Sequence, residues 1–164
     1  MTARPHRPKP TPSKTKRALR REPNRARSLE DLERDDWGDP KPDDTGLVAR
    51  CLAARRVPIG ALSIEQLRML IGQRIGLAYL VVIAIEAVER DPFVSGDLYP
   101  GDLLSALSVL PREAWTAMPE LRERLRVALA RAADADATPT DEALDREPLR
   151  RTLSQCARAF AANA

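Results

Sequence analysis

The sequence predicts an all-α fold: a single compact domain of about six helices behind a basic N-terminal tail. Aromatic residues make up only 4% of the 164-residue chain, whereas Ala, Leu and Arg are abundant. This composition favours helices over the β-branched and aromatic surfaces of sheets. Apolar residues also recur at helical spacing from residue 44 onward. The part that follows the tail is of the usual size for one hydrophobic core.

Residues 1–27 are predicted to form a disordered tail. The segment contains five prolines and ten Lys or Arg residues, with hardly any large apolar side chain besides Leu19. Such a segment buries too little apolar surface to offset the entropy lost on ordering. Because Glu22 is its one acidic residue, the tail carries a net charge of +9 and residues 28–164 carry −6. Two interpretations remain open for the tail: a dispensable extension, and an arm that binds phosphate non-specifically.

The first helix is predicted over residues 44–56. Asp44 or Thr45 can cap it, because their side chains accept hydrogen bonds from the free amides of the first turn. Its buried face is expected to comprise the apolar residues Leu47, Val48, Cys51 and Leu52.

A short second helix is predicted to begin after Ser63. Ser63 and Gln66 fit a capping box, in which each side chain satisfies a free backbone amide of the other residue. The buried stripe is expected to comprise Ile64, Leu67, Leu70 and Ile71. Gly72 and Gly76 are expected to let the chain turn.

Residues 77–90 are predicted to form the helix at the centre of the core, because they are apolar nearly all round. The Val-Val-Ile run within it also fits a buried strand by propensity. The length of about 14 residues and the lack of partner strands elsewhere favour a helix. Asp91-Pro92 is expected to end it.

Three more helices are predicted before the C-terminus. One follows Pro100, carries Asp102 in its first turn and ends at Pro111. Another covers residues 119–133, so residues 28–133 form the helical domain and 134–146 a linker. The last runs from about 147 to 161 within the C-terminal segment 147–164. We expect it to dock on the core through Leu149, Leu153, Cys156 and Phe160, and we expect Trp115 to be a core residue.

The residue types needed for catalysis are sparse. The only histidine, His6, lies in the tail, which disfavours His-dependent catalysis and ordinary zinc sites. Cys51 and Cys156 lie on apolar helical faces and are expected to be inert core residues. The two Gly-rich places lack the Lys-Ser/Thr of a P-loop. The sequence therefore predicts a protein that is not an enzyme, with no catalytic residue, cofactor or metal ligand.

Five aspartates cluster within ten residues, at positions 35, 36, 39, 43 and 44. Three interpretations are open: a Mg²⁺ or Ca²⁺ site, a solvated loop with helix caps, and an acidic contact surface. The regular ligand order of a calcium loop is missing, which disfavours the first. Trp37 within this cluster fits either a staple onto the core or an interface anchor. Tyr99 likewise fits core packing or partner contact.

The sequence is typical of a cytoplasmic, reduced protein. No apolar run has the features of a signal peptide. The longest, Leu77 to Ile85, has nine residues, about half of what a bilayer-spanning helix needs. Its two cysteines show no CxxC spacing.

Three blocks follow one another at characteristic distances: Ser28-Leu-Glu-Asp-Leu-Glu-Arg-Asp-Asp-Trp-Gly-Asp-Pro40, Leu62-Ser-Ile-Glu-Gln-Leu-Arg-Met-Leu-Ile-Gly-Gln-Arg-Ile-Gly-Leu77 and Gly96-Asp-Leu-Tyr-Pro-Gly-Asp-Leu-Leu104. Together they resemble the bacterial contact-dependent growth inhibition immunity proteins, small cytosolic proteins that neutralise a toxin domain delivered by a neighbouring cell. The resemblance covers roughly residues 28–130. It implies stoichiometric, non-catalytic binding of a cognate toxin C-terminal domain.

The acidic charge of the body suggests where such a toxin would bind. Toxins of this class are expected, by the resemblance, to be nucleases, tRNA-directed enzymes or other basic proteins, which an acidic surface would attract. The acidic loops 30–44 and 89–102 are therefore the candidate surface. The candidate toxin-binding residues are Asp35, Asp36, Trp37, Asp39, Asp97, Tyr99 and Asp102.

The alternative function is a nucleic-acid-associated helical regulator that uses the basic tail as an electrostatic arm. Two of the helices would then form a helix-turn-helix. The candidate helices show no face rich in Lys or Arg, and an acidic body repels phosphate. Immunity is therefore the favoured function.

Overall fold

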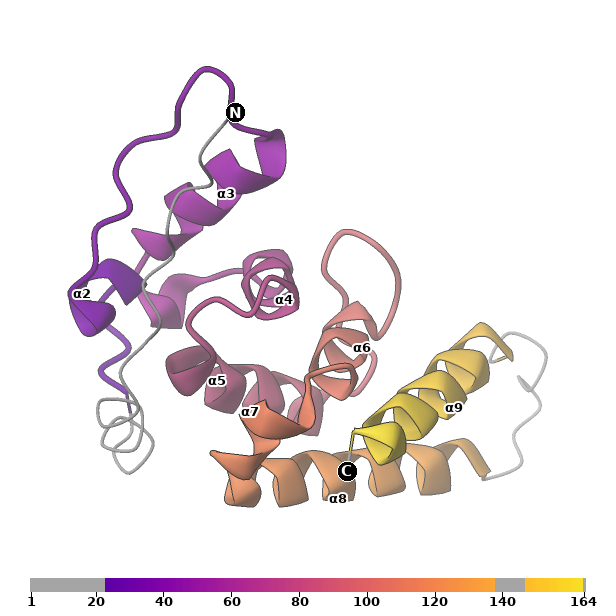
Figure 1. The fold of residues 1–164 in the computed structure, drawn as a ribbon. Coiled ribbons are helices and arrows are strands. Elements are labelled where there is room, and N and C mark those ends of the chain that lie inside the picture. The colour runs from indigo at the N-terminus through magenta and orange to yellow at the C-terminus, as the bar shows by residue number, and fades with distance from the viewer. Residues whose placement is uncertain (1–22, 138–146, 164) are drawn as a thin grey trace.

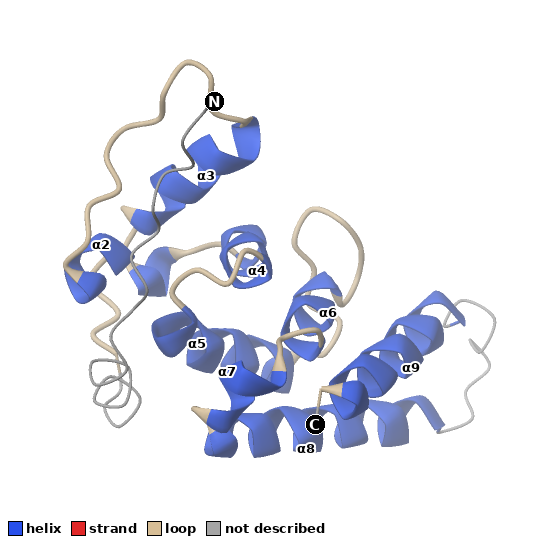
Figure 2. Ribbon diagram, viewed as in Figure 1, coloured by secondary structure: helices blue, strands red, loops and turns tan. Residues whose placement is uncertain are grey.

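The computed structural model describes residues 23–137 and 147–163, and within these ranges the chain is all-α, as predicted. This part of the chain contains eight α-helices and one 3-10 turn, and Figures 1 and 2 show how the helices are arranged. The elements are α2 (Leu29–Glu33), α3 (Gly46–Arg55), η1 (Ile59–Ala61), α4 (Ile64–Gly72), α5 (Leu77–Arg90), α6 (Asp102–Ser108), α7 (Arg112–Thr116), α8 (Pro119–Ala137) and α9 (Glu147–Ala162). The described residues form no strand, only an isolated bridge between Ser28 and Pro58.

Helix α5 lies at the centre and has the bounds that its apolar pattern predicts. It packs against α4, α6, α8 and η1. Its buried residues lie on all sides except the one that carries Glu86, Glu89 and Arg90. This near-complete burial explains why the segment has no polar stripe, and the strand interpretation is wrong.

The predicted caps are present. The Ser63 hydroxyl accepts from the Gln66 amide at 3.1 Å, and the Gln66 side chain accepts from the Ser63 amide at 2.9 Å. Thr45, rather than Asp44, caps α3 by accepting from the Val48 amide. A second capping box, formed by Ser28 and Asp31, begins α2.

The turn between α4 and α5 differs from the prediction. Gly72 is the last residue of α4, and the turn instead uses Arg74 and Gly76, with φ values of 58° and 65°. Gly76 is needed for a second reason, because a Cβ there would lie 2.7 Å from the Leu29 side chain. The backbone of this turn therefore sits directly against the buried start of α2.

The segment between α6 and α8 contains a helix that the sequence pattern did not predict. Helix α6 ends at Ser108, and Pro111 precedes α7 instead of ending the helix before it. Trp115 of α7 is 1% exposed and is a core residue, as predicted. Helix α8 continues to Ala137, beyond the predicted end at residue 133. The rest of the predicted linker, residues 138–146, lies outside the described residues.

Helix α9 packs against α6 and α8 (Figure 1). Leu153, Cys156 and Phe160 are buried, whereas Leu149 is half-buried. The Phe160 ring meets Trp115 edge to face, with ring centroids 5.7 Å apart. The apolar stripe of α9 thus completes the core on this side.

Residues 23–27 belong to the folded part, although they were expected to be part of the disordered tail. The Ile59 amide donates to the Arg27 carbonyl and the Gly60 amide to the Arg25 carbonyl, both at 2.9 Å. The Arg25 guanidinium also pairs with Glu86 of α5 at 2.6 Å. The expected boundary at residue 27 is therefore wrong, because the folded part of the chain includes at least Arg25 and Arg27. Residues 1–22, which the rest of that prediction concerns, lie outside the described residues.

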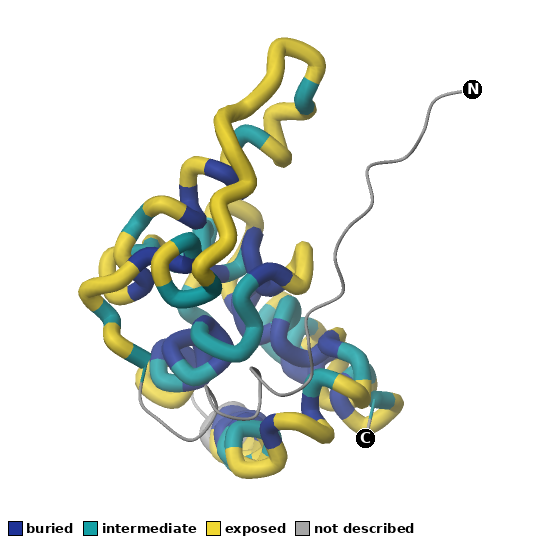
Figure 3. The backbone as a smooth tube through the Cα atoms, turned by 60° about the vertical axis from the view of Figure 1, so that its left-hand side comes forward, coloured by how far each residue is buried: buried dark blue, intermediate teal, exposed yellow. Residues whose placement is uncertain are grey.

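The beginning of α3 and the loop before it project from the body (Figure 3). Leu47 and Val48 are 37% and 41% exposed, so the expected burial of this turn is wrong. Cys51 and Leu52, one turn further on, are buried. The apolar face of α3 therefore extends past the body that covers its second half. The described helices include none with the length and apolar character needed to span a membrane.

Candidate protein-binding surface

Exposed large apolar side chains gather on two loops and the helix start beside them. We call residues 34–45 the acidic loop and residues 91–101 the Tyr99 loop. Of the six large apolar side chains that are exposed in the described part of the chain, all but Val109 lie on the acidic loop, the start of α3 or the Tyr99 loop. The five are Trp37, Leu47, Val48, Leu98 and Tyr99. Apolar side chains concentrated in this way mark a candidate contact surface.

Arg55, the last residue of α3, anchors the acidic loop. Its side chain is fully buried, and its guanidinium pairs with Glu33 at 2.5 Å and donates to the Asp35 carbonyl at 2.8 Å. The Nε of Arg55 is buried and has no hydrogen-bond partner among the described residues. Since a buried charge requires compensation, these contacts hold the loop tightly to the end of α3.

Trp37 is held on this anchor while part of it faces solvent. The Arg55 guanidinium carbon lies 3.8 Å from the ring centroid, and the indole N–H donates to the Asp35 carboxylate at 3.0 Å. Trp37 remains 41% exposed. Trp37 is therefore stapled to a core residue, and its exposed ring surface keeps the interface-anchor interpretation as a prediction.

Arg56 binds the outer part of the acidic loop. Its guanidinium donates to Asp39 at 2.7 Å, to the Gly38 carbonyl at 2.9 Å and to Glu30 at 3.1 Å. The hydrogen bond that Arg56 donates to Asp39, followed by the one that it donates to Glu30, raises the pKa of Arg56. Asp36 lies 4.0 Å from the same side chain. Part of the loop's negative charge is thus balanced within the protein, which the sequence did not reveal.

The Tyr99 loop is held by a network of charges around the buried side chain of Asp102. Asp102, which is 2% exposed, accepts from the Gly96 amide at 2.8 Å and from the Leu98 amide at 3.2 Å. Glu65 of α4 accepts from the intervening Asp97 amide at 3.2 Å. Arg68 lies between the two carboxylates, with a bidentate bond to Glu65 at 2.6 Å and Asp102 at 3.8 Å.

This network sets which side chains of the Tyr99 loop face solvent. Three consecutive amides point inward to carboxylates, and Leu98 and Tyr99 are left 61% and 46% exposed. Asp97 is exposed as well. Asp102, expected among the contact residues, is buried beneath the loop, because its carboxylate serves the loop amides. It therefore shapes this surface from below.

Helix α4 connects the two parts of the surface. It packs against both α3 and α6, and Figure 1 shows α3 and the Tyr99 loop rising on either side of it. The pKa of Glu65 is lowered, first by its hydrogen bond to Arg68 and in smaller part by the charge of Arg50 on α3. The surface thus has a continuous support made of α3, α4 and the start of α6.

The negative charge of the body lies on the same side. Residues 28–110 contain 14 acidic and 8 basic residues, whereas residues 112–164 contain nine of each. The acidic loop and helices α8 and α9 lie at opposite ends of the molecule (Figure 1). The net charge of −6 is therefore carried by the part that bears the exposed apolar side chains.

The described residues hold no group of three or more His, Cys, Asp or Glu side chains placed to bind a metal ion. The clustered aspartates instead serve the backbone and Arg56: Asp36 accepts from the Gly38 amide and Asp44 from the Lys41 amide, both at 2.8 Å. The two cysteines are buried and free, and burial raises the pKa of the Cys51 thiol.

Comparison with known proteins agrees with these features. The family model for CDI (contact-dependent growth inhibition) immunity proteins matches residues 31–125. No curated protein and no solved structure matches the chain significantly. The matched segment is more than half of the chain and includes both loops of the surface together with α3 to α7. The chain belongs to the family of CDI immunity proteins.

Proposed function

We propose that this chain binds the cognate toxin C-terminal domain of a CDI system in a one-to-one complex and blocks it without catalysis. Membership of the immunity family supplies the role. The observation that carries the proposed surface is the gathering of exposed apolar side chains on the acidic loop, the start of α3 and the Tyr99 loop.

Trp37 and Tyr99 are the proposed anchors of the complex. Interface energy is concentrated in a few aromatic and Arg residues near the centre of a contact. Both rings are part exposed, and both are carried by loops that buried charges hold in place. Because these loops are already ordered, binding loses less conformational entropy than it would with mobile loops.

The proposed partner surface is basic around an apolar centre. Asp35, Asp36, Asp39 and Asp97 border the two aromatic anchors and are exposed. Charges at the rim of an interface act mainly on the rate of encounter, and they set which partners are attracted. The toxin would therefore present Lys or Arg around a hollow that takes the aromatic rings.

The experiment is a binding titration with the purified toxin domain encoded beside this chain. Replacing both Trp37 and Tyr99 with Ala should weaken binding by more than a hundredfold, given about 2 kcal/mol or more for each interface anchor. Val109→Ala is the matched control, because Val109 is 57% exposed but lies outside the surface. Unchanged affinity in the double variant would place the toxin elsewhere. No complex with the wild-type chain would contradict the proposed function itself.

A further inference from the structure

A hollow between α7, α8 and the end of α9 has no part in the proposed complex. Its volume is about 380 Å³, and its lining includes Arg112, Trp115, Arg122, Arg126 and Phe160. Small-molecule sites start at about 300 Å³. We propose that this hollow binds a phosphate group carried by a small molecule such as a nucleotide. The proposal does not depend on toxin binding, because the hollow lies at the opposite end from the acidic loop.

The charges around the hollow are unbalanced. Its single acidic residue, Glu123, is bound by Arg126 through two hydrogen bonds of 2.6 and 2.8 Å, and this contact lowers the Glu123 pKa. Arg112 and Arg122 make no ion pair within the described ranges 23–137 and 147–163. Two guanidinium groups thus remain beside a hollow whose only carboxylate is already engaged.

The floor of the hollow includes two aromatic side chains, Trp115 and Phe160. The Trp115 indole N–H is buried and has no acceptor among the residues that the structure describes. The Arg122 guanidinium carbon lies 5.5 Å from the Phe160 ring centroid, over the ring face. The site therefore offers the guanidinium donors of Arg112 and Arg122 beside the rings of Trp115 and Phe160.

Phosphate fits this chemistry better than a neutral ligand. It supplies several acceptor oxygens and negative charge, and guanidinium groups bind it in a forked geometry. The volume exceeds that of a bare phosphate ion, which leaves room for part of the group that carries it.

The site is built where the family core meets the C-terminal helix. The family match ends at residue 125, whereas Phe160, which closes the hollow, belongs to α9. Binding here would therefore strengthen the attachment of α9, since a ligand that touches both parts stabilises their contact.

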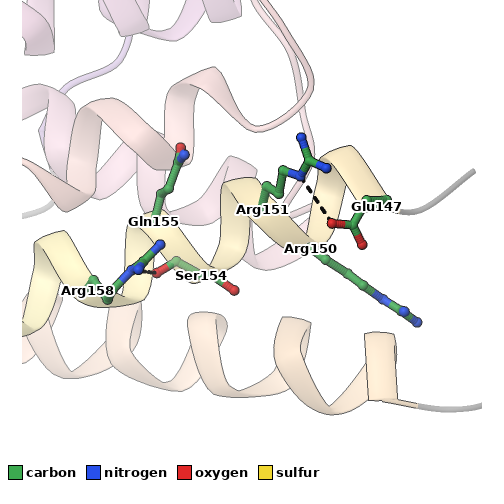
Figure 4. Close-up of a pocket in the computed structure, with 6 residues that line it drawn as sticks. All are labelled: Glu147, Arg150, Arg151, Ser154, Gln155 and Arg158. Carbon is green, nitrogen blue, oxygen red and sulfur yellow. Dashed lines mark hydrogen bonds and ion pairs between the residues drawn. The ribbon is translucent and has the colours of Figure 1, made fainter.

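A second hollow, on the outer face of α9, supplies the control. All six labelled side chains in Figure 4 come from this one helix. Arg151 pairs there with Glu147 at 3.1 Å, and Arg158 donates to its own helix at the Ser154 carbonyl. Arg158 is exposed and outside the proposed site, so it matches Arg112 in charge without sharing its position.

The test uses the full chain with Trp37→Phe, which leaves Trp115 as the only tryptophan. AMP and inorganic phosphate are titrated at constant ionic strength while Trp115 emission is followed. AMP should give a saturable change. Arg112→Ala should weaken binding at least tenfold, and Arg158→Ala should leave it within twofold. Because Arg112 is exposed, its removal is expected to leave the fold intact, which circular dichroism checks.

Two outcomes would overturn the proposal, and two others define which part of the ligand the site binds. No saturable change with either probe, or equal losses in the two arginine variants, would overturn it. Saturation by phosphate and AMP with equal affinity would support a site for the phosphate group alone. A stronger response to AMP would show that the site also takes part of the nucleoside.

Discussion

The guanidinium carbon of Arg55 lies 3.8 Å from the centre of the Trp37 ring, and the Arg55 side chain is fully buried. The partly exposed ring therefore packs on a buried charge. A residue of the proposed contact surface is thereby coupled to the folded core. The coupling also explains why a loop with five clustered aspartates keeps a defined shape. Changes at Arg55 should therefore affect both stability and toxin binding.

Arg55→Ala should destabilise the protein by about 3–5 kcal/mol, the usual effect of breaking a buried ion pair by removing one partner. The loss would include the bond to the Asp35 carbonyl and the contact with Trp37. Arg55→Lys should restore only part of the lost stability. An ammonium group cannot reproduce the forked hydrogen bonds of a guanidinium or its planar stacking on the Trp37 ring. Urea unfolding gives the free energies.

Arg56→Ala is the control for this series. Arg56 is exposed and binds the outer loop, so its removal should have a much smaller effect on stability. If the two alanine variants lose equal stability, the central role of Arg55 in holding the loop is wrong.

Asp102→Ala should release the Tyr99 loop. Two loop amides would lose a charged acceptor, at a cost of about 2–3 kcal/mol. The amides of Gly96 and Leu98 should then exchange hydrogen faster, while the exchange rates of the amides in α5 should not change. Asp97→Ala provides the comparison, because its exposed carboxylate makes no ion pair in the described part of the chain. Unchanged exchange in the Asp102 variant would show that the loop holds its shape without this side chain.

The Glu65–Arg68 pair should give the Tyr99 loop a defined pH dependence. Because the folded-state pKa of Glu65 is lowered, its contribution is fully present above the ordinary Glu pKa of about 4.3 and is lost as pH falls through the lower folded value. The stability difference between wild type and Glu65→Gln should be constant above about pH 5 and shrink below about pH 4. Unfolding curves across this range measure it.

Glu120→Gln, at an exposed position in the first turn of α8, is the reference for that pH series. A Glu65→Gln difference that grows on acidification would contradict the sign of the Glu65 pKa shift.

Charge reversal on the surface should slow toxin association. Asp97→Lys should lower the association rate and flatten its dependence on salt, with a smaller effect on dissociation, because rim charges act during encounter. Glu120→Lys makes the same charge change on α8, away from the surface (Figure 1). Stopped-flow kinetics at several salt concentrations compare them. Equal slowing by both would mean that net charge, and not this face, steers the partner.

Local patterns in the sequence predicted the centre of the fold well. The apolar run 77–90 has the bounds of α5, and the Ser63 capping box is present as predicted. Both depend on short-range spacing, which a sequence shows directly. Helix α7 was missed because its five residues lie between Pro111 and Pro119, which resemble the limits of a loop.

Features that depend on distant contacts could not be predicted. Residues 23–27 are basic and read as tail, but their carbonyls pair with the amides of η1. Leu47 and Val48 follow the helical period of buried residues, yet α3 extends past the body that would cover them.

The candidate site shows the same division. Trp37 and Tyr99 were predicted as contact residues from their chemistry, and both are partly exposed on loops. Their contact with a partner stays a prediction. The roles of Arg55, Arg56 and Arg68 were missed, because an arginine on or beside a helix is expected to be solvent-exposed until its carboxylate partners are placed. Asp102 was counted with the exposed aspartates, since burial of a charged residue depends on the loop that folds over it.

The most direct test of the account is protection of cells that express the toxin C-terminal domain encoded beside this chain. The wild-type chain and a chain that begins at residue 23 should both restore growth, because the acidic loop and the Tyr99 loop lie after that point. The variant with Trp37 and Tyr99 both replaced by Ala should fail to protect at an equal level of folded protein. Full protection by that double variant, together with loss of protection on removing residues 1–22, would contradict the central claim that this face neutralises the toxin.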